Sequence, residues 1–437
     1  MRTSINLGAW FNFLGSCIRV VSSIDSANGV ALVSPPYKYT VLMIGQCFCA
    51  LAQPFIMFVT TKFANTWFGE NQRALANTLA LGSNTVGILI GAFISPQIVN
   101  SSVTFVSQMC LLNLISCVVS IFPAIMACFI TRSTPPSPPS YSAMINTRQT
   151  ETNDTNEYLL NEDASERLIQ TPTFKENFKI YLSHIAKLLK SKDFLILLFS
   201  FGLSLGLFNA LTTLIEQIIC VRGYSDDDAG YFGGAMIVSG IVGSILAGVI
   251  LDKTKRFEEL AKICFAMSSL SSIFFCILQL YDNDKSVIYY LILISFCLIG
   301  FFGLPLLPIC MEMSIECVYP IPEATSTGLL FIGGQIFGII MIILYPKVST
   351  KLDPNSYTYI SVQKCGTSDT FSNSTMSTTT ASPDSLDVLD FKIPLFSQTI
   401  LLNVISLFFI MFFKCAYLRL RSEREKLAEQ ILNSARQ

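Results

Sequence analysis

The sequence predicts an all-α membrane protein. Of its 437 residues, 51% are hydrophobic and only 14% are charged, and the mean hydropathy is +0.55. Ordinary soluble domains contain about 25% charged residues, so a soluble protein is disfavoured. The net charge of −1 provides no basic surface for a nucleic acid. We therefore expect a lipid bilayer around the protein and no nucleic-acid partner.

The pattern of apolar segments predicts ten membrane helices. A bilayer core about 30 Å thick is crossed by roughly 20 apolar helical residues. Segments of this kind occur at 5–22, 40–61, 74–96, 104–130, 194–220, 229–251, 263–281, 286–311, 327–346 and 393–413. Of the 59 charged residues, only Arg19 and Glu216 lie inside them. The first segment is the weakest and could be a signal peptide, although Gly8, Gly15 and Ser16 suit a packed helix face.

The distribution of basic residues predicts that both termini lie in the cytosol. In this orientation the inside segments contain 21 Lys and Arg residues and the outside segments contain 7, as the positive-inside rule requires. The long segment 347–392 then lies outside, where the sequon at Asn373 can be glycosylated. A second sequon, at Asn100, lies closer to the membrane, where glycosylation is less favourable. The sequon indicates the plasma membrane, with the lysosomal membrane as the alternative.

The long connections divide the chain into four parts. These are an N-terminal half (1–130), a cytosolic linker (131–192), a C-terminal half (193–413) and a cytosolic tail (414–437). The linker opens with a proline-rich run at Thr134–Ser140, which is typical of a flexible spacer. Its last part, 173–192, has the pattern of an amphipathic helix on a membrane surface. The basic start of the tail predicts a short helix that faces anionic lipid.

A signature motif follows the segment 229–251. The run Gly248-Val249-Ile250-Leu251-Asp252-Lys253-Thr254-Lys255-Arg256 fits the pattern G-x-x-x-D-[RK]-x-x-[RK] of the major facilitator superfamily. It places a carboxylate at a helix end beside a tight basic turn, which can tie neighbouring helices in one transport state and release them in another. We expect a gating role for Gly248, Asp252, Lys253 and Arg256. An ordinary positively charged loop is the alternative.

The position of this motif indicates an incomplete first half. In the superfamily the motif of the second half joins helices 8 and 9, so the segment 194–220 is helix 7. Only four of the expected six helices then precede the linker. We therefore predict the fold of the major facilitator superfamily with ten helices present and helices 1 and 2 of the usual twelve missing.

Polar side chains in equivalent helices of the two halves predict a solute site. Asn84 and Thr85 lie in helix 5 of this numbering and Gln335 lies in helix 11, and each amide precedes a glycine by three residues. Facing amides near the midplane are groups that a polar solute can use. The alternative is that they only join neighbouring helices.

Helix 7 of this numbering has a polar face. Asn209, Glu216 and Gln217 are spaced so that they share one side of the helix. Glu216 is the only acidic residue inside a predicted span. An acidic residue within a membrane helix indicates a functional role, because its burial in lipid is costly. We expect these residues to contact solute or a coupling proton, although Glu216 is near the outer end, where water could simply hydrate it.

Several longer motifs resemble those of the feline leukaemia virus subgroup C receptor-related transporters, solute carrier family 49. They are Gly45–Pro54, Trp67–Asn77, Leu214–Cys220, Glu316–Pro320 and Glu323–Gly328. The run Thr134–Ser140 resembles the orphan A3 branch of that family. The resemblance implies a twelve-helix carrier of choline, ethanolamine, a vitamin or haem. It also implies a choline site with an aromatic cage and glutamines on helices 5 and 11, of which Gln335 matches the second and Thr85 replaces the first.

These observations predict transmembrane transport of a small organic solute by alternating access. The cage tryptophan of helix 1 would fall in the missing part, and no histidine lies in a predicted span to ligate haem. The alternative function is a membrane receptor without transport, or a truncated isoform that binds a full-length partner. The sequence contains no catalytic motif and no metal-ligand cluster, so we expect neither an enzyme nor a bound cofactor.

Overall fold

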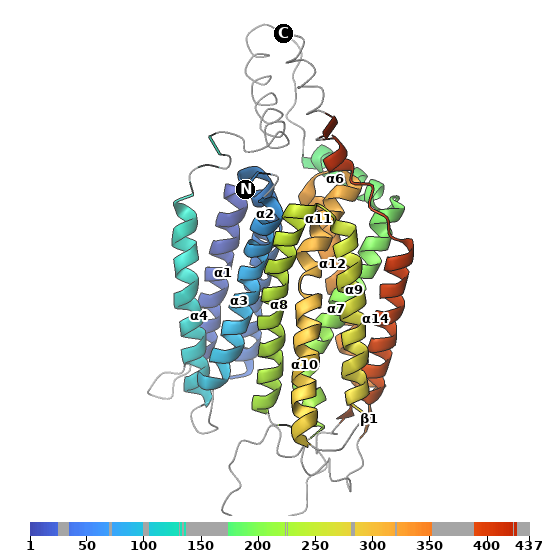
Figure 1. Ribbon diagram of the computed structural model, residues 1–437. Helices are drawn as coiled ribbons and strands as arrows, with labels where there is room; N and C mark the ends of the chain where they lie inside the picture. The colour runs from blue at the N-terminus through green and yellow to red at the C-terminus, as the bar shows by residue number, and fades with distance from the viewer. Residues whose placement is uncertain are drawn as a thin grey trace, which may run out of the picture.

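The computed structural model is a bundle of long, roughly parallel helices (Figure 1). It describes residues 1–24, 35–69, 72–98, 105–130, 174–222, 226–280, 285–319, 321–351 and 389–425 without Glu423, and a few isolated positions between them. The helices are α1 (Arg2–Ser23), α2 (Pro35–Trp67), α3 (Arg73–Ile98), α4 (Phe105–Cys128), α6 (Phe174–Leu188), α7 (Lys192–Cys220), α8 (Asp226–Thr254), α9 (Phe257–Leu278), α10 (Lys285–Gly303), α11 (Leu306–Val318), α12 (Glu323–Val348) and α14 (Lys392–Phe412). Both predicted sequons, Asn100 and Asn373, and most of the linker lie outside the described residues.

The predicted membrane helices agree with the structure except at the first segment and at the segment 286–311. Within the described ranges, nine helical segments are long and apolar enough to cross a membrane, and each overlaps a predicted span. The segment 5–22 forms α1 but is not among the nine, since Arg19 and two asparagines lower its hydropathy. Helix α1 nevertheless packs in the bundle against α2 and α4. The expected absence of family helices 1 and 2 stays a prediction.

Small residues bring α1 close to α2, as the sequence pattern indicates. Gly8, Gly15 and Ser16 are buried. A Cβ atom on Gly15 would lie 2.6 Å from both the Sγ of Cys49 and the carbonyl oxygen of Gly45 on α2. The packing of this pair therefore depends on glycine at position 15.

The predicted span 286–311 is interrupted in the structure and extends beyond its predicted end. The segment 286–311 was predicted to be one helix, but α10 ends at Gly303 and α11 runs from Leu306 to Val318. Pro305 lies between them and lacks the N–H that would continue the hydrogen-bond ladder. Interrupted helices are common near solute sites of secondary carriers.

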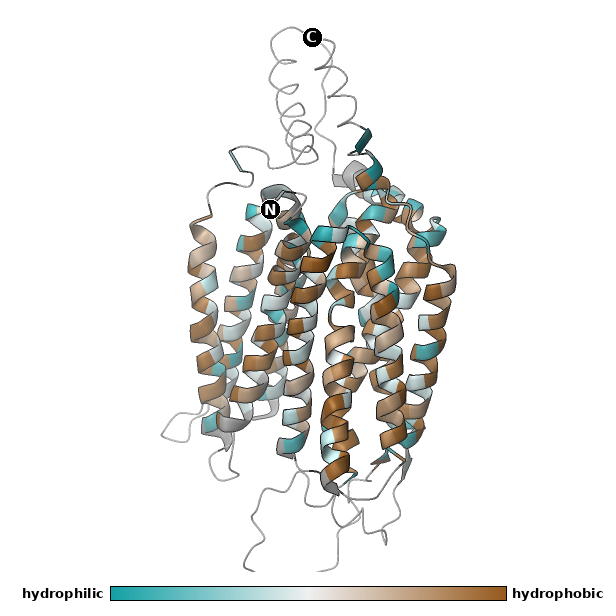
Figure 2. Ribbon diagram, in the orientation of Figure 1, coloured by the Kyte–Doolittle hydropathy of each residue, from teal (hydrophilic) through white to brown (hydrophobic). Residues whose placement is uncertain are grey.

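The helices form two groups that meet along α2, α3, α8, α11 and α12. We name α1–α4 the first group and α7–α14 the second group; in Figure 1 they occupy the left and right sides. Helix α3 packs against α8, and α2 packs against α12. The two largest clusters of buried apolar side chains lie mainly in the second group, although one of them includes Ala74 of α3, and a small cluster of Met57, Leu81 and Met311 joins the groups. Apolar residues fill the middle of the bundle, whereas polar ones gather at its ends (Figure 2).

The two ends of the bundle carry different connections. The N-terminus, α6 and residues 413–422 lie at one end, named the upper end after its place in Figure 1. The predicted amphipathic helix at 173–192 is confirmed as α6, whose Leu188 is fully buried against the second group. In the tail, residues 413–417 are not helical, and a helix is present at 418–422 and at 424–425, where the described residues end. At the lower end, the strands β1 (Thr350–Lys351) and β2 (Leu389–Asp390) pair antiparallel.

Candidate functional site

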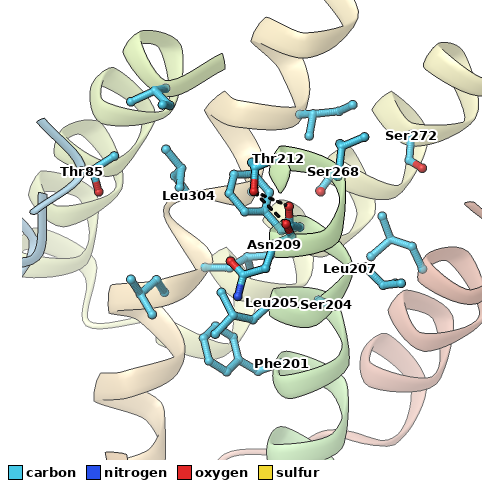
Figure 3. Close-up of a pocket in the computed structure, with 18 of the residues that line it drawn as sticks. Thr85, Phe201, Ser204, Leu205, Leu207, Asn209, Thr212, Ser268, Ser272 and Leu304 are labelled. Carbon is cyan, nitrogen blue, oxygen red and sulfur yellow. Dashed lines mark hydrogen bonds between the residues drawn. The ribbon is translucent and has the colours of Figure 1, made fainter. Parts of the chain in front are cut away.

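A cavity of about 280 Å³ lies between the two groups of helices. Helices α2 and α3 of the first group and α7, α9, α12 and α14 of the second group contribute to its wall, together with the break between α10 and α11. In Figure 3, Thr85 faces this space from one side, Ser268 and Ser272 face it from the other, and Asn209 and Thr212 of α7 lie between them. The cavity therefore lies at the interface between the two groups of helices.

Four of the six predicted solute residues line this cavity. Asn84, Thr85, Asn209 and Gln335 are all in its wall. The amide side chains of α3 and α12 thus line the same cavity. This arrangement is the one expected from their spacing, and their contact with solute stays a prediction.

The other two predicted residues, Glu216 and Gln217, lie outside the cavity wall. Both are exposed on α7. Glu216 follows Asn209 by seven residues, so it lies on the same helix face about 10 Å closer to the lower end. These two side chains therefore lie between the cavity and the lower end of the bundle and do not form the cavity itself.

The polar part of the cavity wall is larger than the sequence predicted. Among the described residues, neither the Ser204 hydroxyl nor the Oε1 atom of Gln398 has a hydrogen-bond partner, although both side chains are more than nine-tenths buried. The Nε2 atom of Gln398 donates to the carbonyl oxygen of Leu207, 3.2 Å away, which orients the amide. Ser272 donates to the Thr399 hydroxyl at 3.2 Å. Sequence reasoning missed these residues because their place in the wall depends on how α7, α9 and α14 pack together.

Asp252 of the signature motif joins the two groups at the upper end. Its Oδ1 accepts the backbone N–H of Ala74 at 3.0 Å, and its Oδ2 accepts that of Leu75 at 2.8 Å. These are two of the unpaired N–H groups in the first turn of α3, where the helix dipole favours a negative charge. The carboxylate of α8 therefore caps a helix of the other group.

The remaining gating candidates differ in their surroundings. Gly248 lies against α3, where an added Cβ would be 3.0 Å from the Thr78 hydroxyl. Lys253 is exposed, and Arg256 forms an exposed pair with Glu259 at 3.1 Å within α9 and its N-terminal turn. Asp252 receives its nearby cation from Lys255, at 3.7 Å. Of the four gating candidates, Gly248 and Asp252 thus have described contacts with the first group.

Replacing Asp252 with alanine is expected to lower the free energy of unfolding by about 1–2 kcal/mol, as the loss of a helix cap does. Two N–H groups of α3 would lose their acceptor, and the join between the groups would weaken. Thermal unfolding of the purified protein in detergent measures the effect. Lys253→Ala is the matched control, because this exposed neighbour contributes no cap. Equal stability of the two variants would contradict the capping role.

Potential metal ligands do not gather in the described part of the chain: it contains no group of three His, Cys, Asp or Glu side chains that could hold an ion. The cavity wall consists of hydroxyl, amide, aliphatic and phenylalanine side chains. Such a wall can bind a small solute through hydrogen bonds and ring contacts.

The fold and a sequence match define the class of protein. The sequence profile of the Major Facilitator Superfamily matches residues 8–342. The solved structure of the proton:xylose symporter XylE bound to 6-bromo-6-deoxy-D-glucose superimposes with a TM-score of 0.58. At 12% identity, covering 95% of this chain and 80% of that one, this likeness shows the fold alone. The protein is a multi-pass membrane transporter of this superfamily.

Relatives in other species identify the family more closely. Solute carrier family 49 member A3 of Xenopus tropicalis is 32% identical over 431 residues, which cover 97% of this chain and 75% of that protein. The choline/ethanolamine transporter flvcr2a of Danio rerio is 28% identical over 354 residues, covering 80% of this chain and 66% of that protein. The chain belongs to solute carrier family 49, which confirms the resemblance seen in the motifs.

Proposed function

We propose that this protein carries a small organic solute across a membrane by alternating access and that the cavity between the two groups is its solute site. The observation that carries the proposal is the pair of unpartnered oxygens on Ser204 and Gln398 in the cavity wall. A buried polar atom without a hydrogen-bond partner lowers the free energy of unfolding by about 1–3 kcal/mol. A solute that donates hydrogen bonds to these atoms would remove that cost.

The state of the two ends supports the same proposal. At the upper end the two groups are joined by Asp252 and by the buried hydrogen bond from Asn77 of α3 to Glu312 of α11. On α7, the side chains of Thr213, Glu216 and Gln217 follow the cavity residues toward the lower end and are exposed. With the upper end in the cytosol, as the basic residues indicate, this arrangement is an outward-facing state. The plasma membrane is our proposed location.

The cavity wall favours a small polar solute, and a choline- or ethanolamine-like amine is our first choice. Small-molecule sites occupy roughly 300–1,000 Å³, so a cavity of about 280 Å³ suits a solute at the low end of that range. Phe201, Phe208, Phe275 and Phe331 are in the wall, and ring faces attract ammonium groups. The amides and hydroxyls would bind the hydroxyl of an amino alcohol. The relative from Danio rerio, a choline/ethanolamine transporter, is consistent with this choice.

Uptake into proteoliposomes tests the proposal, with radiolabelled choline, ethanolamine and pyridoxine as the first solutes. Replacing Gln335 with alanine should raise the KM several-fold, since an exposed amide contributes about 1 kcal/mol to binding. Gln217→Ala is the matched control: it removes the same side chain from outside the cavity wall and should leave the KM unchanged.

Two results would count against the proposal. If none of the three solutes enters faster than in protein-free liposomes, an amine or vitamin carrier of this kind is excluded. If uptake occurs but Gln335→Ala behaves like Gln217→Ala, Gln335 is not part of the solute site.

A further inference from the structure

Residues 413–422, named the tail strap, lie across the upper end of the second group. The strap follows α14 and contacts both α9 and α11. The backbone N–H of Cys415 donates to Glu258 Oε2 at 2.9 Å, and the Tyr417 hydroxyl accepts the backbone N–H of Glu258 at 3.0 Å. Burial raises the pKa of Tyr417 to about 12, so its hydroxyl stays neutral. The strap is therefore part of the packed structure at this end.

The backbone of the strap shows that these contacts determine its path. Tyr417 has a φ of 47°, in the left-handed region that bulky residues rarely adopt. Such a conformation persists only where the surrounding structure holds it. Directly after it, residues 418–422 turn into a short helix that brings Arg419 over α11.

Arg419 is the charged centre of this contact. Its Nε donates to Glu316 Oε1 at 2.7 Å, and its Nη2 donates to Glu312 Oε2 at 3.1 Å. All three side chains are at least 95% buried. The backbone N–H of Leu420 completes the coordination of Glu316 by donating to its Oε2 at 3.1 Å.

Glu312 also reaches the other group of helices. Its second oxygen, Oε1, accepts the side-chain N–H of Asn77 on α3 at 3.2 Å, and Asn77 is fully buried. A continuous chain of contacts thus runs from the strap through Arg419 and Glu312 to α3. Asn77 lies one turn from Ala74 and Leu75, whose N–H groups bind Asp252.

We propose that Arg419 is a positioning residue that holds the upper end closed, by neutralising Glu312 and Glu316 so that Glu312 can bind Asn77 across the interface. Without the guanidinium, two buried carboxylates one helical turn apart would face each other with no cation between them. Water would have to enter to solvate them, and the contact with α3 would separate. Release of the strap thus opens the upper end. This inference rests on the proposed transport cycle, because the contact it controls is one that the cycle must break.

Thiol labelling at the upper interface tests the inference without any solute. Thr78 is buried beside Gly248, between the two groups, so a Thr78→Cys thiol reports how often this interface opens. The full-length protein is labelled with N-ethylmaleimide, and the peptide that contains position 78 is quantified by mass spectrometry. In this background, Arg419→Gln should raise the labelling rate about tenfold or more, because it leaves buried carboxylates unpaired.

A matched control lies two residues further along the strap. Arg421 is exposed and pairs with Glu425 at 2.9 Å on the surface, so Arg421→Gln should label at the rate of the unmodified background. Arg419→Lys provides a second variant that keeps the charge and therefore the fold. Lysine lacks the planar fork that serves both carboxylates, so its labelling rate should fall between the other two.

Equal labelling of Arg419→Lys and Arg421→Gln would overturn the inference, even if Arg419→Gln fails to fold. The result is separate from that of the uptake assay. If the variants label as expected but the protein transports none of the tested solutes, the role of the tail strap is supported and the proposed solute class is wrong. If the protein transports a tested solute but all variants label equally, the proposed solute class is supported and the role of the tail strap is wrong.

Discussion

Replacing Gln398 with leucine is expected to reduce solute uptake about five- to twelvefold while the protein remains folded. The two side chains are similar in size, but leucine cannot offer the Oε1 atom that lies unpartnered in the cavity wall. A hydrogen bond to a solute at this site is worth about 1–1.5 kcal/mol, and every 1.4 kcal/mol is a factor of ten in affinity. The effect should exceed that of Gln335→Ala, because Gln398 is buried whereas Gln335 is exposed.

The same substitution at a second buried glutamine separates solute binding from folding. Gln279 ends α9 and is 4% exposed, and its Nε2 atom also has no partner among the described residues, but it does not line the cavity. Gln279→Leu should leave uptake unchanged. The comparison is made as initial uptake per folded protein, with monodispersity from size-exclusion chromatography. If both variants transport equally well, Gln398 does not contact the solute.

The contrast between Gln335 and Gln398 shows which site residues the sequence could predict. Asn84 and Gln335 each precede a glycine by three residues in apolar segments, and this repeated spacing is the signal by which the sequence predicts a shared site. Gln398 is a single amide in an apolar segment, and its sequence neighbourhood resembles that of a residue that packs between helices. Its contact with the carbonyl oxygen of Leu207 depends on how α14 packs on α7. Helix periodicity predicts the faces of one helix but not which helix each face meets.

The charged residues at the upper end show where a helix boundary predicted from the sequence is wrong. The last predicted boundary of the segment 286–311 fell just before Glu312, because a carboxylate in a membrane helix is costly. The helix instead continues to Val318 and buries both Glu312 and Glu316. Arg419, more than 100 residues later, supplies the compensating charge. A window of local sequence cannot reveal a partner at this distance, so the boundary could not be predicted correctly.

The close approach of α8 and α10 leads to the largest expected effect on stability. A Cβ atom on Gly300 would lie 1.9 Å from the carbonyl oxygen of Met236, and one on Gly243 would lie 2.1 Å from that of Phe301. These are backbone atoms, which cannot rotate away as a side chain can, so the two helices would have to separate. Overpacking of a core commonly lowers the free energy of unfolding by about 1–3 kcal/mol, sometimes more. A clash with backbone atoms is expected to have an effect at the upper end of this range. Gly300→Ala should therefore destabilise the protein by about 3 kcal/mol or prevent its folding.

A glycine on α8 in open space provides the control for this substitution. An added Cβ on Gly230 would meet nothing within 4 Å, and alanine is a better helix former than glycine by about 1 kcal/mol. Gly230→Ala should therefore raise the unfolding temperature slightly, whereas Gly300→Ala should lower it by several degrees. Fluorescence-detected size-exclusion chromatography after heating measures both. A shift of the same sign in the two variants would mean that α8 and α10 do not pack through their glycines, and the cavity wall next to Gly303 would then need a different support.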